Sequence, residues 1–448
     1  MPTMSSKKFF LRPAWLAVCI FIASLLFLGL ASADPSEKPS PPTKRQIRQP
    51  RASGDIRIQT LLNNKELQAF GEKIFFDKTL SDPPGMACVT CHDQNAGWTG
   101  PDSAVNLAGS IYPGAVAARF GNRKPNSAAY ATFAPALYAK MVEGEILFVG
   151  GNFWDGRATG NLLGNPAADQ AQQPFLNPVE HNVKDGLELV RLVEKSNYAK
   201  EFVALCERLG LDTSLDDQSQ ARIKFGYIGL ALAAFENSGK VNAFTSKYDA
   251  YLRGKVRMSP AERRGLKLFE TKGKCADCHP SALGPKGELP LFTDFTYDNL
   301  GIPANPDNPW YRMDAGINPA GKNWIDEGLG GFLKTQPQYA ALVGANLGKH
   351  RVPTLRNIDK RPNAKFVRRY GHNGYFPDLE SIIHFYNTRD TKPFIKGIGG
   401  LDTRGKWPKP EVAVNVNKEE MGNLKLTQKE EEDILTFLKT LSDGYEAK

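Results

Sequence analysis

Two short cysteine motifs carry the clearest chemical signal in the sequence. The pattern Cys-x-x-Cys-His occurs at Cys88, Cys91 and His92, and again at Cys275, Cys278 and His279. This spacing is the attachment signature of c-type haem, in which two thioethers hold the porphyrin edge and the adjacent imidazole supplies the proximal iron ligand. Because the motif occurs twice, the sequence predicts two covalent c-type haems.

Two other kinds of site use paired cysteines. A zinc site with four cysteine ligands would leave the two matched histidines without a role. A thioredoxin-like redox pair requires a strand-turn-helix context that neither motif has. Both stay as alternatives to haem. Cys206 lies in an apolar run and is most simply a small buried side chain.

Similar stretches precede the two motifs and predict the helices that position them. They read Glu66-Leu67-x-x-x-Gly71-x-x-x-Phe75 and Glu262-x-x-Gly265-x-x-x-Phe269. Ser259 and Glu262 form a capping box with Pro260 at the first helical position, so the second stretch starts a helix. A central glycine leaves room for another helix to cross closely. This duplication predicts two cytochrome c domains in tandem.

Composition places the chain among ordinary globular proteins. It has 448 residues, 41% of them hydrophobic and 23% charged, which is enough for two or three compact domains. The 41 glycines and 31 prolines favour long loops and argue against a large sheet. We therefore expect a loop-rich protein without a large sheet.

The basic charge is concentrated at the N-terminus. The formal net charge is +9, but residues 1–56 hold eight Lys or Arg against three Asp or Glu, so the remainder is close to neutral. That remainder contains no basic cluster typical of nucleic-acid binding, and we expect no nucleic-acid partner.

The first 54 residues have the pattern of an export signal followed by a tether. Basic residues precede an apolar run, which ends at Ala31-Ser32-Ala33. We expect a signal peptide over residues 1–33, with cleavage after Ala33. An uncleaved membrane anchor is the alternative, because the apolar run approaches the length of a membrane helix. Residues 34–54 are rich in proline and basic residues and predict an extended tether.

Several further motifs give the chain a family resemblance over residues 60–445. They are Phe153-Trp154-Asp155-Gly156-Arg157, Gln170-Ala171, Asn177-Pro178-Val179-Glu180, Leu291-Phe292-Thr293-Asp294-Phe295, Val352-Pro353-Thr354-Leu355-Arg356-Asn357 and Gly371-His372-Asn373-Gly374. With the two haem motifs, they resemble the bacterial di-haem cytochrome c peroxidases and, more closely, their MauG-like relatives. The resemblance implies two mainly helical domains: an N-terminal one over residues 55–245 with the peroxide-reactive haem, and a C-terminal one over 246–448 with the electron-transfer haem.

The resemblance also assigns roles around the first haem. It implies that His92 is the proximal ligand and that Gln170 and Glu180 lie on the open distal face. A carboxylate above the iron can take a proton from the near peroxide oxygen and deliver it to the leaving one. A surface or capping role is the alternative for Glu180. His181 stands where the family commonly has Met.

The first haem is expected to have an open distal position. Reductively activated peroxidases block that position with a loop histidine soon after the first motif, but this chain has no histidine between His92 and His181. The resting ferric haem is therefore expected to be five-coordinate or water-bound. His181 is the alternative blocking ligand, or a hydrogen-bond partner of the adjacent Glu180.

Tyr386 is the expected distal ligand of the second haem. It stands where the peroxidases have Met and where MauG-like enzymes have Tyr. No Met occurs between Met313 and Met421. An anionic phenolate stabilises oxidised iron, whereas a thioether raises the haem potential. The alternative is that Tyr386 is a core aromatic residue on a helix.

Two more residues take roles from the resemblance. Trp154 resembles the indole that bridges the two haems, with core packing as the alternative. Asn122 is the nearest match to the side-chain ligand of an inter-domain calcium ion. Val367 and Arg369 stand where Thr and Pro are usual near that site.

The resemblance implies a periplasmic oxidoreductase that reacts with hydrogen peroxide at the first haem. In the MauG-like version both irons become high-valent, and a side chain of a partner protein is oxidised. In the second version the enzyme is a peroxidase that receives electrons from a small cytochrome c or cupredoxin. A third possibility is a non-enzymatic di-haem electron carrier. A membrane association is expected only if the N-terminal segment is uncleaved.

Overall fold

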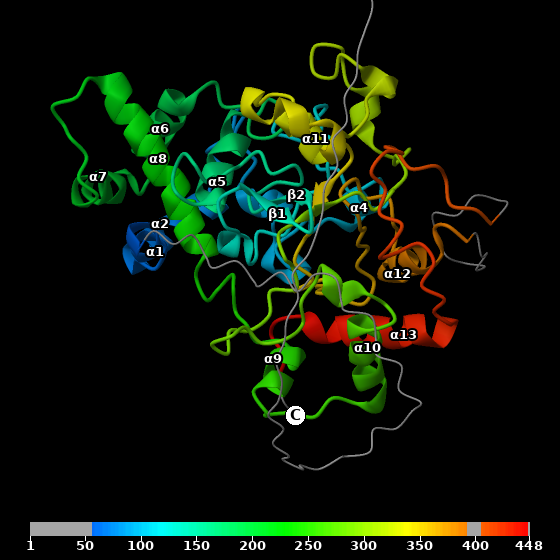
Figure 1. The fold of residues 1–448 in the computed structure, drawn as a ribbon. Coiled ribbons are helices and arrows are strands. Elements are labelled where there is room, and N and C mark those ends of the chain that lie inside the picture. Colours follow the sequence, from blue (N-terminus) through cyan, green and yellow to red (C-terminus); the bar gives the residue numbers. More distant parts are fainter. Residues whose placement is uncertain (1–55, 392–404, 447–448) are drawn as a thin grey trace, which may run out of the picture. The chain divides into compact units, whose positions relative to one another are not determined.

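The chain folds into helices connected by long loops. A computed structural model describes residues 56–391 and 405–446 (Figure 1). The expected signal peptide and tether, residues 1–33 and 34–54, lie outside the described residues. Within the described part, the sheets are two small antiparallel pairs of strands. The prediction of a mainly α, loop-rich fold is confirmed.

Most of the secondary structure is helical, and the strands are short. The α-helices are α1 (Ile56–Leu62), α2 (Lys65–Phe76), α3 (Cys88–Cys91), α4 (Ser103–Leu107), α5 (Pro166–Leu176), α6 (Gly186–Glu194), α7 (Ala199–Arg208), α8 (Asp217–Glu236), α9 (Lys247–Leu252), α10 (Pro260–Glu270), α11 (Gly328–Leu333), α12 (Leu379–Thr388) and α13 (Gln428–Leu438). The strands are β1 (Tyr138–Val142), β2 (Glu145–Val149), β3 (Tyr297–Asp298) and β4 (His350–Arg351). Short 3-10 helices cover Gln94–Ala96, Ala131–Phe133, Cys275–Asp277, Pro309–Arg312, Gly321–Asn323, Pro337–Leu342, Gly344–Asn346 and Lys439–Leu441.

Each haem motif follows a helix that crosses another helix at a glycine. Helix α2 packs on α8, and α10 packs on α13, which lies beside it in Figure 1. A Cβ added to Gly71 would lie 1.8 Å from the Ala231 carbonyl oxygen, and one added to Gly265 would lie 1.9 Å from that of Asp433. The prediction that Gly265 admits a crossing helix is therefore confirmed, and Gly71 makes the same kind of contact in the first half.

Side-chain caps stabilise the N-terminal ends of α10 and α13. Ser259 accepts a hydrogen bond from the Glu262 N–H, and the Glu262 carboxylate accepts one from the Ser259 N–H. Thr427 and Glu430 form the same reciprocal box at the start of α13. These caps satisfy N–H groups that a helix start leaves unpaired.

Two large hydrophobic cores lie in the described part. The first is built largely from α2, α5, α6, α7 and α8, and the second from α10, α12, α13 and the loops between them. Leu291 and Phe295 come from the second half of the sequence but pack in the first core. The division at residues 245 and 246 stays a prediction.

A buried ion pair ties the Val352–Asn357 motif to α9. The Arg356 guanidinium donates to both carboxylate oxygens of Asp249, at 3.0 and 2.7 Å, and both side chains are almost fully buried. A fork-shaped guanidinium matches a carboxylate in this two-bond geometry. The motif thus has a structural role in closing the second core.

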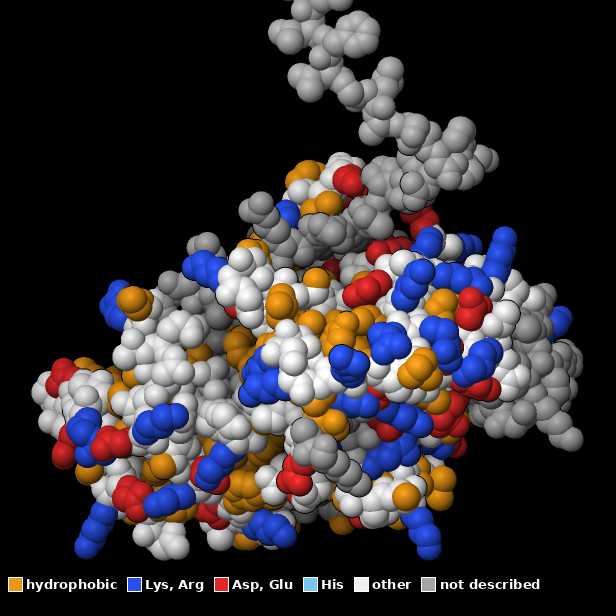
Figure 2. Space-filling view, turned by 90° about the horizontal axis from the view of Figure 1, so that it is seen from below, with side chains coloured by type: hydrophobic (Ala, Val, Ile, Leu, Met, Phe, Trp, Pro, Cys, Tyr) orange, Lys and Arg blue, Asp and Glu red, His pale blue; other side chains and the backbone are white. Residues whose placement is uncertain are grey.

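The surface carries mixed charge on the face shown in Figure 2, where Lys and Arg side chains alternate with acidic and hydrophobic ones. None of the helices in the described ranges combines the length and the apolar character that crossing a membrane requires.

Candidate functional site

The first Cys-x-x-Cys-His motif folds so that its histidine faces a cavity. Cys88 and Cys91 bound α3, and the His92 N–H donates to the Cys88 carbonyl at 3.0 Å. The His92 Nδ1–H donates to the Trp98 carbonyl at 3.2 Å, because a carbonyl can only accept. Nε2 therefore keeps its lone pair for a metal, and burial lowers the pKa of His92 to about 4.

The second motif repeats this geometry. The His279 N–H donates to the Cys275 carbonyl at 2.9 Å, and its Nδ1–H donates to the Phe292 carbonyl at 2.8 Å. Burial lowers the pKa of His279 to about 4, so the imidazole is neutral. Two neutral imidazoles, each fixed through Nδ1, are what proximal haem ligands require.

The first cavity collects the site residues expected around the first haem. Its walls include Cys88, Cys91, His92, Trp154, Gln170 and Glu180, together with His181, Glu236 and Trp310. Gln170 lies on α5, and Glu180 lies in the turn that follows that helix. The structure thus brings the predicted ligand and the predicted acid-base residue into one cavity.

Glu180 is held in place on both sides. Its Oε2 accepts a hydrogen bond of 2.6 Å from Asn177 Nδ2, and its carbonyl accepts one of 2.7 Å from the Ala115 N–H. Burial raises the pKa of the carboxyl group, and the Asn177 bond partly opposes this effect. Oε1 accepts no hydrogen bond from the part of the chain that the structure describes, and it is available to a ligand of the cavity.

His181 lines the same cavity, and its ring is anchored to a different segment of the chain. Its Nδ1–H donates to the Leu80 carbonyl at 2.9 Å, and its ring packs on Phe175 with 4.8 Å between centroids. Burial lowers its pKa, so the ring is neutral. Its expected role, as a blocking ligand or as a partner of Glu180, stays a prediction.

Glu236 is a second cavity carboxyl group, which the sequence motifs did not indicate. It ends α8, it is 6% exposed, and burial raises its pKa to about 8. The available signal was an acidic residue at the end of an apolar stretch, Leu230–Phe235. Such a residue rarely lies in a core unless it faces a polar group or a cavity.

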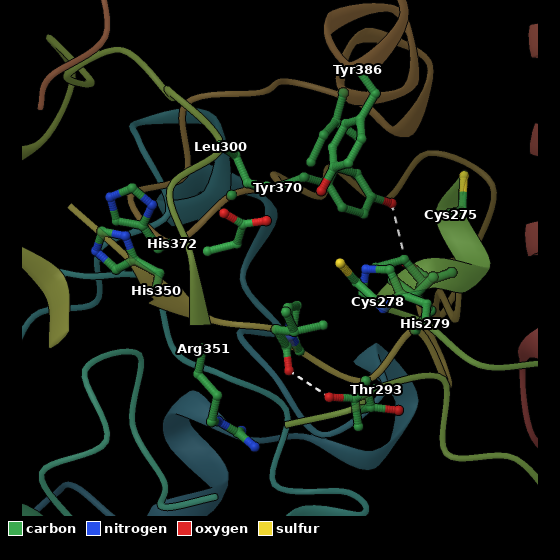
Figure 3. Close-up of a pocket in the computed structure, with 18 of the residues that line it drawn as sticks. Cys275, Cys278, His279, Thr293, Leu300, His350, Arg351, Tyr370, His372 and Tyr386 are labelled. Atoms are coloured by element: carbon green, nitrogen blue, oxygen red, sulfur yellow. Dashed lines mark hydrogen bonds between the residues drawn. The ribbon is translucent and has the colours of Figure 1, made fainter. Parts of the chain in front are cut away.

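The second cavity holds the other expected ligand pair. Cys275, Cys278 and His279 approach it from the second motif, and Tyr386 points into it from α12 (Figure 3). Burial raises the pKa of Tyr386. The Tyr386 hydroxyl has no hydrogen-bond partner in residues 56–391 and 405–446, whereas the neighbouring Tyr370 hydroxyl donates to the Ile358 carbonyl at 3.2 Å.

Met421 is a further candidate ligand in this cavity. The stretch of sequence without methionine ends at Met421, and the structure places this residue in the cavity wall, 3% exposed. A loop after α12 brings it there, which the sequence pattern did not indicate. A thioether and a phenol hydroxyl are therefore both present, with opposite effects on haem potential.

The two cavities share part of their walls. Lys124, Trp154 and Arg351 line both, and Trp154 Nε1 donates to the Lys124 carbonyl at 2.9 Å. Burial and the nearby Arg368 lower the pKa of Lys124 to about 7. Trp154 lies in this shared wall, and its role as a bridging indole stays a prediction.

An ion-pair network lies beside this shared wall. The Arg123 guanidinium donates to both oxygens of Asp326, at 2.7 and 2.6 Å, and to Asp155 at 2.6 Å. His350 and His372 stack next to Asp326 with ring centroids 3.6 Å apart (Figure 3). Burial alone would raise the pKa of Asp326, but Arg123 holds it well below its usual value. Arg123 already occupies this carboxylate, so the cluster is built as an ion-pair network.

Unpaired buried donors around the cavities fit the carboxylate edges of haem. Within the described ranges, Arg351 Nε, Arg368 Nε and Trp310 Nε1 are buried without a hydrogen-bond partner. Each residue lines a cavity. Cationic and N–H donors are the partners that propionate groups take. The residues present therefore fit two haems, one in each cavity.

Asn122 lines the first cavity, and its carbonyl accepts a hydrogen bond of 2.9 Å from Asn308 Nδ2. Its neighbours Arg123 and Lys124 bring positive charge close to the expected calcium site. The calcium ion stays a prediction.

Comparison with known proteins gives consistent matches over most of the chain. A family model described as "Di-haem cytochrome c peroxidase" matches residues 65–257. The methylamine utilization protein MauG of Paracoccus denitrificans is 33% identical over 380 residues, which cover 84% of this chain and 88% of that protein. The cytochrome-c peroxidase IdrP1 of Denitromonas iodatirespirans is 26% identical over 386 residues, which cover 84% and 81%. The crystal structure of the diheme peroxidase BthA from Burkholderia thailandensis aligns with a TM-score of 0.68 and 29% identity, covering 85% of this chain and 87% of that chain.

Proposed function

The chain belongs to the di-haem cytochrome c peroxidase and MauG family, and we propose that it is a periplasmic oxidoreductase that reacts with hydrogen peroxide in the His92 cavity. In this proposal the oxidising equivalents are shared with the cavity of His279 and Tyr386, as in MauG-like chemistry. Family membership implies two c-type haems, which supply the iron at which the peroxide O–O bond breaks. The single observation that carries the proposal is that Trp154 lines both cavities.

Glu180 moves the proton that peroxide cleavage requires. Its free Oε1 accepts the proton of the near peroxide oxygen and returns it to the far oxygen, which leaves as water. Asn177 keeps the other carboxylate oxygen occupied, so the acceptor is oriented. The full reduction of hydrogen peroxide to two waters takes two electrons and two protons.

Tyr386 and Trp154 determine where the two oxidising equivalents reside and how they move between the cavities. As a phenolate, Tyr386 favours oxidised iron in the second cavity. Burial disfavours a phenolate that no cation compensates, so Tyr386 would ionise only with a cation such as haem iron beside its unpartnered hydroxyl. The rigid, oxidisable indole of Trp154 provides the route between the cavities.

A second candidate function is a peroxidase that takes electrons from a small cytochrome c or cupredoxin. Met421 in the wall of the second cavity favours this version, because thioether ligation would suit an electron-accepting relay. A non-enzymatic electron carrier is less well supported, since it gives no use to the Glu180 carboxylate in the His92 cavity.

Calcium binding at Asn122 is proposed from the resemblance. The competing arrangement uses the neighbouring Arg123 guanidinium as the local cation. Elemental analysis of purified holoprotein before and after dialysis against a calcium chelator decides between them. We expect about one calcium per chain that the chelator removes with loss of peroxide reactivity; a calcium-free, fully reactive protein contradicts the proposal.

Rapid mixing of the fully oxidised holoprotein with hydrogen peroxide, without reductant, tests the function. We expect an immediate spectral change of both haems. A response only after one electron has been supplied supports the activation-gated peroxidase and makes His181 the suspected blocking ligand. Tight cyanide binding to one ferric haem would exclude the pure electron carrier.

A further inference from the structure

Trp310 connects the first cavity to a loop that lies outside the sequence motifs. It lies in the 3-10 helix Pro309–Arg312 and forms part of the cavity wall that also contains His92 and Glu180. Its Nε1 is buried without a hydrogen-bond partner in the described ranges. The indole is therefore directed into protein at the cavity rather than into bulk solvent.

The backbone around Trp310 is fixed from both sides. Its N–H donates to Asn308 Oδ1 at 2.9 Å, and its carbonyl accepts from Asn318 Nδ2, also at 2.9 Å. Asn308 in turn donates to the Asn122 carbonyl, which ties the loop to the cavity. These bonds fix the backbone from which the Trp310 ring projects.

A second indole continues outward from Trp310. The Trp324 ring lies 5.9 Å from the Trp310 ring, centroid to centroid, at an interplanar angle of 71°. The Tyr311 ring lies 6.1 Å from Trp324 on the same loop. Trp324 is partly exposed, and the next residue, Ile325, is 53% exposed. The aromatic contacts thus run from the cavity wall to the surface.

We propose that Trp310 and Trp324 form an electron path between the first cavity and the protein surface. This inference rests on the proposed reaction with peroxide. Each peroxide withdraws two electrons, and the path delivers them one at a time. Trp310 gives one electron toward the cavity, and Trp324 reduces the oxidised Trp310. A donor at the surface then reduces Trp324. Trp154, by contrast, leads to the second cavity.

Without a donor, electron loss through the path leads to covalent oxidation of Trp324. Removal of two electrons and two protons, with addition of the oxygen of one water, converts its indole to hydroxytryptophan. Hydrogen peroxide takes up these electrons and protons and yields two waters. The net reaction consumes one peroxide, adds one oxygen atom to the indole and releases one water.

Peptide mass spectrometry of the oxidised holoprotein after peroxide treatment, without reductant, tests the path. We expect oxygen addition at Trp324 in the wild type and its loss in Trp310→Phe. The matched control is Trp407→Phe, which removes an indole that lines neither cavity; it should leave Trp324 oxidation unchanged. Hydroxyl-radical footprinting of Trp324 should be the same in Trp310→Phe and the wild type, which excludes a change in exposure.

A second variant keeps the test decisive if Trp310→Phe misfolds. Trp324→Phe alters a partly exposed ring, and it should slow the decay of the peroxide-induced haem spectrum. Trp324 oxidation that is independent of Trp310, or a decay unchanged in Trp324→Phe, overturns the path alone. A wild-type haem spectrum that does not respond to peroxide overturns the proposed function and the path with it.

Discussion

The Glu180 carboxylate combines a raised pKa with a free oxygen beside the first haem motif. We expect Glu180→Gln to slow the peroxide reaction by about 10²–10⁴-fold, because an amide cannot accept the proton. The carboxylate form is the reactive base, so the wild-type rate should fall as the pH drops through a pKa above the usual 4.5. Stopped-flow rates against pH check both statements.

The Gln substitution keeps the size of the side chain and its contact with Asn177, so the haem spectra should not change. A variant that reacts at the wild-type rate, or that keeps the low-pH limb, would contradict a role for Glu180 as the base.

Tyr386 and Met421 are alternative candidate ligands in the wall of the second cavity. We expect Tyr386→Phe to change the ferric spectrum of one haem and to raise its reduction potential, because a phenolate is lost. The matched variant Met421→Leu, which keeps an apolar side chain of similar volume, should leave both unchanged. Spectroelectrochemical titration measures the potentials. The reverse pattern would assign the ligand to Met421 and favour the peroxidase function.

Glu236 should make stability depend on pH. Its pKa is about 8 in the folded protein against 4.5 for an ordinary carboxyl group, so the folded chain binds more protons between these values. Stability then decreases as the pH rises from about 4.5 to about 8, by at most about 1.4 kcal/mol per pH unit. Chemical unfolding of holoprotein at several pH values should show a shallower decrease in Glu236→Gln. Equal slopes in the two proteins would place the Glu236 pKa near its ordinary value.

At the scale of elements, the two helix crossings depend on the absence of a side chain. A methyl group at Gly265 would overlap the Asp433 carbonyl, so we expect Gly265→Ala to cost about 1–3 kcal/mol or more. Gly239→Ala is the control, since no atom of the described residues lies within 4 Å of a Cβ there. Urea unfolding of both holoproteins measures the difference, and similar stabilities would mean that α10 and α13 separate easily.

Elements near the haem motifs could be predicted from the sequence because their signals are local. The capping box at Ser259, the glycine at Gly265 and the Cys-x-x-Cys-His spacing each lie within a few residues of the feature they specify. Met421, Glu236 and Trp310 could not be placed in this way. They reach the cavities through long loops or at a helix end, and tertiary packing alone brings them beside His92 or His279.

At the scale of the whole molecule, Trp154 lies in the wall that the two cavities share. We expect Trp154→Phe to leave the peroxide response of the first haem intact and to delay that of the second, because phenylalanine is much harder to oxidise than tryptophan. Rapid-freeze spectroscopy that separates the two haems measures the delay. Trp407→Phe serves again as the control. Simultaneous responses in Trp154→Phe would show that electrons cross the shared wall elsewhere.

The cysteines lining the two cavities bear on when the cofactors become attached. Attachment needs reactive sulfur, and the thiolate is the reactive form. In the folded chain, burial raises the pKa of both Cys88 and Cys275 to about 12, which keeps these thiols protonated. We therefore expect thioether formation to be easier on the open polypeptide than on the folded chain.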